Sequence, residues 1–328
     1  MRIQTAAFVL CCLLGCRSQE VAESMGSIER LNERLAAVID EGASIEKLAD
    51  GFEWSEGPLW IEDHQMLLFS DVPANTIFRW KEGEGASVYL KPSGYTGTPP
   101  RGGEPGSNGL VLSPTGKLVL CQHGDRRMAV MVAPLDDPQP LFATLADNFE
   151  GKKLSSPNDA IYDREGNLYF TDPPYGLAND TLREIPFQGV YRLNIHGEIS
   201  LLVDTLTRPN GIALSPDQSL LYIANSDPDK ARWYEYQLSG DSISSGRIFY
   251  DATELTGTLP GLPDGMKVDS AGNIFATGPG GIFVFDSKAE VLGKISLPNP
   301  TANCALADDG KTLYITSDMN VLRIKMRH

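Results

Sequence analysis

Residues 210–225 read NGIALSPDQSLLYIAN, and this pattern decides the fold because it recurs along the chain. It consists of a polar residue, a glycine, a short apolar run, a turn with proline, aspartate or glycine, and a second apolar run. Two alternating runs joined by such a turn predict a β-hairpin. The other copies begin, in chain order, at Glu56, Asn108, Asn158, Asp264 and Asn303.

The spacing of the copies predicts the architecture. Consecutive copies begin about 50 residues apart, and only the last interval is shorter, at about 39. The stretches between them hold further strand-like runs, such as GVYRL at 189–193 and RWYEYQL at 232–238. Four short strands in about 50 residues is the size of a propeller blade, so six copies predict an all-β fold, a six-bladed β-propeller. Two stacked β-sandwiches are the alternative, but they would not require a polar residue at the same point of each copy.

The last copy is followed by too few strands to complete a blade. The segment SIEKLA at 44–49 precedes the first copy and could supply the missing strand, which would close the ring. We therefore expect the propeller to span residues 44–328.

Composition limits the class of protein. The chain has 328 residues, 41% of them hydrophobic, which supports a sizeable core and excludes a disordered chain. Its 28 basic and 43 acidic residues give a net charge of −15. No cluster of Lys and Arg offsets this charge, so no nucleic-acid partner is expected, whereas an acidic chain can hold cations.

The N-terminus predicts export. The apolar run Ala6–Leu14 is too short to span a bilayer, and residues 1–15 are typical of a secretory signal peptide. Leu13–Cys16 resembles the lipobox of bacterial lipoproteins, which predicts cleavage before Cys16 and its lipidation; an ordinary signal peptide is the alternative. Arg17 is not the aspartate associated with inner-membrane retention. We therefore expect a lipid anchor in the outer membrane facing the periplasm, or a periplasmic protein.

Residues 16–43 are polar and are predicted to be a tether with a short amphipathic helix, because apolar residues recur at helical spacing at Ile28, Leu31, Leu35 and Val38. Beyond this tether only Cys121 and Cys304 remain. Each lies in a strand-like run, so we expect buried free thiols rather than a disulfide framework.

The residue that begins each copy carries a side-chain oxygen in all six cases. The innermost strand of a blade lines the central channel, so these residues would form a ring around one axis. Turn chemistry is the alternative interpretation of Asn or Asp followed by Gly, but it explains Glu56-Gly57 and Asn158-Asp159 less well and gives no reason for an oxygen in all six cases. A ring of carboxylates and amides without thiol or imidazole favours a hard cation, and Glu56 and Asp264 would neutralise one divalent ion.

A second polar level ends the return strand of five copies, 14 or 15 residues later in the sequence, and could line the mouth of the channel. Its members are Asp71, Gln122 with His123, Asp172, Asn225 and Ser317. From this level we expect His123 and Asp172 to contact substrate, together with Asn108 and Asn158 of the first ring.

The motifs, taken in order, resemble the gluconolactonase/regucalcin (senescence marker protein) family of six-bladed propellers. They are EGPLW from Glu56, SNGLVLSPTGKL from Ser107, CQHGDRRM from Cys121, SPNDAIYD from Ser156, FTDPPYG from Phe170, RPNGIALSPD from Arg208 and PDGMKVD from Pro263. The resemblance implies a divalent metal, commonly Ca²⁺, on Glu56, Asn210 and Asp264, with Asn158 at the metal or the substrate. It also implies hydrolysis of aldonolactones, although some relatives open phosphorus–fluorine bonds.

The expected activity is therefore metal-dependent hydrolysis of a sugar-acid lactone. Ca²⁺ is the expected ion, with Mg²⁺, Mn²⁺ and Zn²⁺ as alternatives. The metal would polarise the lactone carbonyl, and Asp264 would act as general base on the attacking water. The rival interpretations are a phosphotriesterase-like or other ester hydrolase on the same site, and a non-catalytic surface propeller that binds a sugar or a protein.

Overall fold

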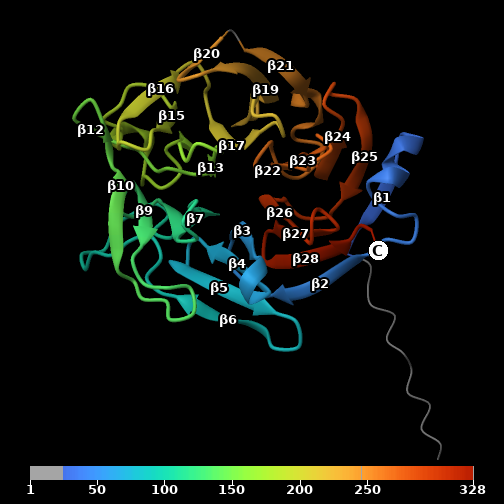
Figure 1. Ribbon diagram of the computed structural model, residues 1–328, viewed down its shortest axis with the longest axis horizontal. Helices are drawn as coiled ribbons and strands as arrows, with labels where there is room; N and C mark the ends of the chain where they lie inside the picture. The colour runs from blue at the N-terminus through green and yellow to red at the C-terminus, as the bar shows by residue number, and fades with distance from the viewer. Residues whose placement is uncertain (1–24, 245, 328) are drawn as a thin grey trace, which may run out of the picture.

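The fold is an all-β ring. A computed structural model describes residues 25–244 and 246–327, which form six antiparallel sheets around one axis (Figure 1). The predicted six-bladed β-propeller is confirmed, and the two strands of each sequence repeat are the two innermost strands of one blade. The part of the chain so described contains no α-helix, and none of its short helices is long and apolar enough to cross a membrane. The predicted signal peptide at 1–15 and Cys16 lie outside the described residues.

Each of the first four blades runs from an innermost strand at the axis to an outer edge strand. Blade 1 contains β3 (Ser55–Ile61), β4 (Met66–Asp71), β5 (Thr76–Lys81) and β6 (Gly85–Leu90); blade 2 contains β7 (Ser107–Leu112), β8 (Leu118–Gln122), β9 (Arg127–Met131) and β10 (Phe142–Ala146). Blade 3 contains β13 (Ala160–Tyr162), β14 (Leu168–Asp172), β15 (Gly189–Leu193) and β16 (Ile199–Val203); blade 4 contains β17 (Pro209–Leu214), β18 (Leu220–Asp227), β19 (Lys230–Ser239) and, on its outer edge, β20 (Ser242–Ile243) and β21 (Arg247–Asp251).

Blades 5 and 6 also include strands from the N-terminal part of the chain. Blade 5 contains β22 (Met266–Val268), β23 (Ile274–Gly278), β24 (Gly281–Phe285), β25 (Val291–Ser296) and β1 (Ser27–Arg30); blade 6 contains β26 (Asn303–Ala307), β27 (Thr312–Ser317), β28 (Asn320–Lys325) and β2 (Ile45–Asp50). The remaining elements are the ribbon β11 (Asn148–Phe149) and β12 (Lys152–Lys153), and the 3-10 helices η1 (Glu33–Ala37), η2 (Glu62–His64), η3 (Asp180–Leu182) and η4 (Thr253–Leu255).

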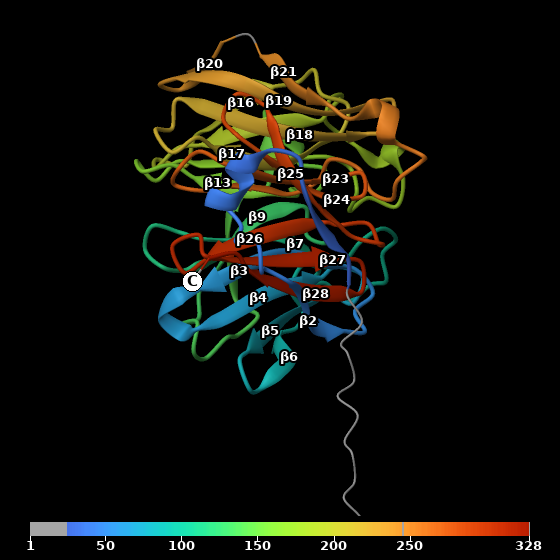
Figure 2. The same ribbon diagram turned by 90° about the vertical axis from the view of Figure 1, so that its right-hand side faces the viewer.

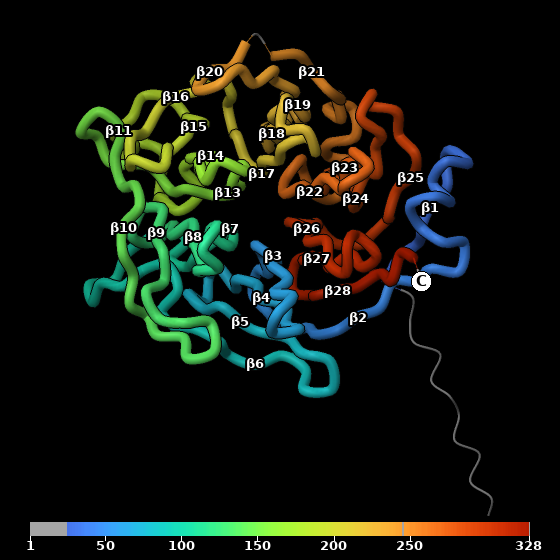
Figure 3. Tube along the Cα trace, viewed as in Figure 1, coloured from blue at the N-terminus to red at the C-terminus, as the bar shows by residue number. Residues whose placement is uncertain are grey.

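The ring closes in blade 6, as the segment at 44–49 predicted. Strand β2 pairs antiparallel with β28, with Ile45 opposite Ile324 and Asp50 opposite Asn320. The first and last propeller strands therefore share one sheet, and the innermost strands β3, β7, β13, β17, β22 and β26 surround the axis without a break (Figure 3).

Residues 25–43 pack along the outside of blades 5 and 6 (Figure 2). Their apolar spacing predicted a helix, but Ile28 lies in β1, because β25 offers an open strand edge that β1 pairs with. The chain then turns at Asn32, whose side chain accepts a hydrogen bond from the Arg34 N–H and begins η1. Leu35 is fully buried between the two blades, whereas Leu31 is 59% exposed. The predicted tether is thus docked from residue 25 onward.

Each pair of neighbouring blades encloses its own hydrophobic layer. Trp233 of blade 4 packs on Phe283 of blade 5, with ring centroids 5.4 Å apart. Cys121 and Cys304 are free and buried in two of these layers, as predicted. Burial raises the pKa of the Cys304 thiol to about 12 and that of Cys121 well above its usual value. Packed layers on both faces of every blade fix the geometry of the channel.

Candidate active site

A cavity of about 460 Å³ opens at one end of the central channel. Its wall includes the first residue of five of the six repeats: Glu56, Asn108, Asn158, Asn210 and Asp264. The sixth, Asn303, is not among the lining residues. Its side-chain oxygen instead accepts hydrogen bonds from the Cys304 N–H at 2.9 Å and from Lys267 Nζ at 3.3 Å. The structure therefore gathers all the expected metal-ligating residues in one cavity.

The glycine that follows most of these residues is needed because neighbouring blades touch there. A Cβ atom on Gly211 would lie 2.1 Å from the carbonyl oxygen of Asp264, and one on Gly57 would lie 2.2 Å from that of Asn108. Both atoms belong to the innermost strand segment of the next blade. The glycine of each Glu-Gly or Asn-Gly pair thus allows the channel residues of neighbouring blades to approach closely. Turn chemistry alone does not explain a glycine at this contact.

Side chains of the second polar level accept hydrogen bonds from the backbone that precedes the channel residues. The Asp71 carboxylate accepts hydrogen bonds from the N–H groups of Glu53 and Trp54, both at 3.2 Å. The Asp172 carboxylate accepts from Ser155 and Ser156 at 2.8 and 2.7 Å.

Asn225 does the same for blade 4, with its Oδ1 accepting from the Arg208 N–H at 2.8 Å. Each bond fixes the backbone two or three residues before a channel residue. Asp172 is fully buried and is not among the lining residues, although we expected it to contact substrate. Burial raises the pKa of Asp172 to about 7, against the opposing effect of its two N–H bonds.

The free oxygens of the cavity fit a hard cation. Within residues 25–244 and 246–327, the buried Oδ1 atoms of Asn108, Asn158, Asn210 and Asp264 have no hydrogen-bond partner. Buried polar atoms are normally paired, so unpaired oxygens that face one cavity indicate a ligand. The amide of Asn210 donates to Ser226 Oγ at 3.0 Å, which leaves its oxygen free. No group of three or more His, Cys, Asp or Glu side chains forms a metal site among these residues; the cavity instead combines amide and carboxylate oxygens, a donor set that a hard cation accepts.

Two buried carboxylates determine the electrostatics of the site. Burial raises the pKa of Glu56 to about 8, despite a hydrogen bond of 2.8 Å from the Gly57 N–H to its carboxylate. Burial, and then the charge of Glu56, raise the pKa of Asp264 well above its usual value. A bound divalent cation would favour the ionised form of both groups and offset the cost of burying them.

Comparison with known proteins identifies the family. Residues 54–319 match the model of the family described as SMP-30/Gluconolactonase/LRE-like region. The chain belongs to this family. It is 39% identical over 314 residues to a gluconolactonase of Zymomonas mobilis, which covers 93% of this chain and 87% of the relative. It is 26% identical to the pentonolactonase XacC of Haloferax volcanii, covering 80% of each chain. The solved structure of a Xanthomonas campestris gluconolactonase superposes with a TM-score of 0.79 at 28% identity, covering 92% of this chain and 95% of the other.

Two ionisable residues of this SMP-30/gluconolactonase family protein line the cavity but lie outside the repeats, so the repeat pattern could not predict them. Glu104 comes from the loop between blades 1 and 2, and Tyr175 ends the FTDPPY stretch after β14. Burial and the nearby Asp264 raise the pKa of Tyr175 above its usual value, and the Arg208 guanidinium lies 5.5 Å from its ring centroid. His123, which we expected to contact substrate, is fully buried behind Glu104 and is not among the lining residues.

Part of the cavity wall is apolar. It includes Pro228, Leu259, Leu262 and Pro300. A ligand with hydroxyl groups on one face and C–H groups on the other would match a cavity that combines polar and apolar walls.

Proposed function

We propose that this protein is a divalent-metal-dependent lactonase that hydrolyses a sugar-acid lactone. One observation carries the proposal: two buried carboxylates and unpaired amide oxygens face one cavity, in a chain that is 39% identical to a gluconolactonase. A purely structural propeller would have no use for two buried carboxylates that line one cavity, because each costs free energy to bury without a partner.

The proposed metal ligands are Glu56, Asn158, Asn210 and Asp264, whose oxygens suit Ca²⁺ first, with Mg²⁺, Mn²⁺ and Zn²⁺ as alternatives. When bound, the ion polarises the lactone carbonyl and stabilises negative charge on its oxygen. Asn108 and Asn158 face the same cavity and would orient the substrate through its polar groups.

Asp264 is the proposed general base. It would accept a proton from the attacking water as the water oxygen bonds to the carbonyl carbon. The ring C–O bond then breaks, and the same carboxyl group returns the proton to the departing ring oxygen, which gives the open-chain hydroxy acid. One oxygen of this carboxylate would bind the ion and the other would take the proton, and no hydrogen bond to another described residue occupies Oδ1.

The test is turnover of glucono-1,5-lactone with and without a chelator, followed by addition of single metal ions. Chelation should abolish turnover and Ca²⁺, Mg²⁺ or Mn²⁺ should restore it. Asp264→Asn should keep the fold and part of the metal affinity, and should lower kcat by about 10² to 10⁴, the range for loss of a general base. Asp63→Asn, at an exposed position, is the matched control. Full activity of the chelated protein, or greater activity on phosphotriesters than on lactones, would contradict the proposal.

We also propose that the protein is exported and held in the outer membrane by a lipid on Cys16. The lactone would be its small-molecule partner. The support is the sequence of residues 1–16. Cys16→Ser should leave unprocessed precursor in the membrane fraction. Secretion of a trimmed, soluble protein by this variant would instead indicate an ordinary signal peptide.

A further inference from the structure

Glu104 presents a carboxylate to the cavity from outside the repeat pattern. It lies in the loop at 91–106 that joins β6 to β7. One carboxylate oxygen, Oε2, is bonded to Nδ1 of His123 at 2.9 Å. The other oxygen has no hydrogen bond to any residue that the structure describes, and the side chain is 40% exposed. One end of this carboxylate is therefore held while the other is open to a ligand.

His123 is fixed in place behind Glu104. Its side chain is fully buried, and it packs so closely on Gly176 that a Cβ there would lie 2.7 Å from the Cβ of His123. Nε2 has no partner among the described residues, so the only polar bond of the ring is the one to Glu104. A buried imidazole with this single bond positions the carboxylate.

The loop that carries Glu104 is held at several points. Arg101 donates hydrogen bonds to the carbonyl oxygens of His123, Gly124 and Gly176, at 3.1, 2.7 and 2.5 Å. Its guanidinium also lies 5.8 Å from the ring centroid of Tyr95. The Arg101 side chain thus connects the loop to the segment after β8 in blade 2 and to the segment after β14 in blade 3.

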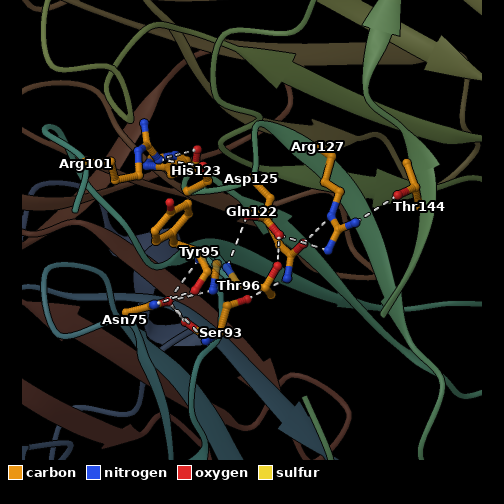
Figure 4. Close-up of polar contacts among 12 residues, drawn as sticks. Asn75, Ser93, Tyr95, Thr96, Arg101, Gln122, His123, Asp125, Arg127 and Thr144 are labelled. Carbon is orange, nitrogen blue, oxygen red and sulfur yellow. Dashed lines mark hydrogen bonds and ion pairs between the residues drawn. The ribbon is translucent and has the colours of Figure 1, made fainter. Parts of the chain in front are cut away.

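The start of the loop is held by side chains of blades 1 and 2 (Figure 4). Asn75 Oδ1 accepts from the backbone N–H of Gly94 at 2.7 Å, and its Nδ2 donates to the Tyr95 carbonyl at 2.9 Å. Asp125 accepts from the Thr96 hydroxyl at 2.6 Å and from Arg127 at 3.0 Å. The polar residues of the CQHGDRRM stretch therefore support the loop, and Glu104 is preorganised before any ligand arrives.

Glu104 shares the cavity with the carboxylates of the reacting centre but is more exposed than they are. Glu56 is a buried residue, whereas the Glu104 side chain is 40% exposed, and, after burial, its charge is one of the causes that raise the pKa of Glu56 and of Asp264. A lactone with its carbonyl at Glu56 and Asp264 would thus present the rest of its ring to Glu104. In a polyhydroxylated lactone that part of the ring carries hydroxyl groups.

We infer that Glu104 is a specificity-determining residue whose free oxygen accepts a hydrogen bond from a ring hydroxyl, with His123 as its positioning residue. This inference rests on the proposed lactonase function. A hydrogen bond to a charged group is stronger than one between neutral groups, so a fixed carboxylate favours a hydroxylated ring over an alkyl lactone.

The experiment separates binding of the ring from chemistry at the carbonyl. It measures kcat and KM for glucono-1,5-lactone, and the Kd of 1,5-anhydroglucitol, a hydroxylated ring without a carbonyl, by calorimetry. Glu104→Leu should raise KM and Kd together by about tenfold to hundredfold and change kcat by less than about threefold. Glu104→Gln should give a smaller rise. Glu41→Gln, at an exposed position, is the matched control, and circular dichroism checks the fold.

His123→Gln tests the positioning role. It should raise KM and Kd in the same direction as Glu104→Gln and leave kcat within about threefold, because the carboxylate remains but is no longer held. A fall in kcat with unchanged Kd in the Glu104 variants would place Glu104 in the chemical step and overturn the inference, as would no change in either constant. A wild-type protein that binds the polyol but does not open the lactone would refute the proposed function and leave hydroxyl binding by Glu104 standing.

Discussion

The contact between neighbouring blades at Gly211 gives a sharp test of how the site is built. In Gly211→Ala, the new Cβ would lie 2.1 Å from the Asp264 carbonyl oxygen and 2.8 Å from the Gly265 Cα. Ordinary contact begins at 3.4 Å, so the backbone of one blade must move by about 1 Å. Both partners are backbone, and no flexible side chain can relieve the overlap.

The shift has two calculable effects. Overpacking of this kind costs about 1–3 kcal/mol of unfolding free energy, and Tm should fall by about 2–4 °C for each kcal/mol. Asn210 and Asp264 would also move apart, while metal–oxygen distances tolerate only about 0.2 Å. We therefore expect Ca²⁺ affinity to fall at least about tenfold, and kcat/KM by about 10²-fold, the usual effect of a 1 Å misplacement.

The assay is thermal unfolding with and without chelator, together with calorimetric titration of Ca²⁺. Gly42→Ala is the matched control, because nothing lies within 4 Å of the Cβ it would add. Wild-type Tm and Ca²⁺ affinity in Gly211→Ala would refute the argument that this glycine sets the distance between the two residues.

Three further predictions concern the charge of the site, the N-terminal segment and the thiols. Burial raises the pKa of Glu56 from 4.5 to about 8, so the folded metal-free protein binds more protons than the unfolded chain between these values. The stabilisation from this proton is complete below pH 4.5 and is lost as the pH rises through about 8. The Tm of the chelated protein should therefore fall over this range, and Ca²⁺ should reduce the dependence of Tm on pH. Leu35→Ala, at a fully buried position, should cost about 2–5 kcal/mol in chemical denaturation, whereas Leu31→Ala, at a position 59% exposed, should stay within about 0.5 kcal/mol of wild type. Peptide mapping after iodoacetamide treatment should find Cys121 and Cys304 unmodified in the folded protein at about pH 8 and alkylated after unfolding; alkylation of the native protein would contradict their burial and raised pKa.

The repeats allowed most of the fold and the floor of the site to be predicted. A polar residue that begins every repeat is expected to face the axis, and this pattern alone predicted that Glu56, Asn210 and Asp264 share one cavity. Asn303 follows the same pattern but is not among the lining residues, since its oxygen bonds the Cys304 N–H and Lys267 and its side chain also hydrogen-bonds Glu56. Such a local choice between partners leaves no periodic signal in the sequence.

Residues outside the repeats could not be placed in the same way. His123 ends a strand near the axis, yet whether it faces the cavity depends on the loop that covers it. Glu104 sits on that loop, among glycines and prolines that have no period. The N-terminal segment was predicted to be helical from its apolar spacing, but the open edge of β25 favoured a strand.

The pairing of the chain ends also determines when the protein can fold. Strand β1 pairs with β25 at 291–296 and β2 pairs with β28 at 320–325, so the first strands find their partners only near the end of the chain. During synthesis, these early strands therefore remain unpaired until almost the whole polypeptide has been made. The ring cannot close on a partial chain. Until β28 has been made, the edge of β2 stays exposed, and it would be the place where an incomplete chain first associates with another copy.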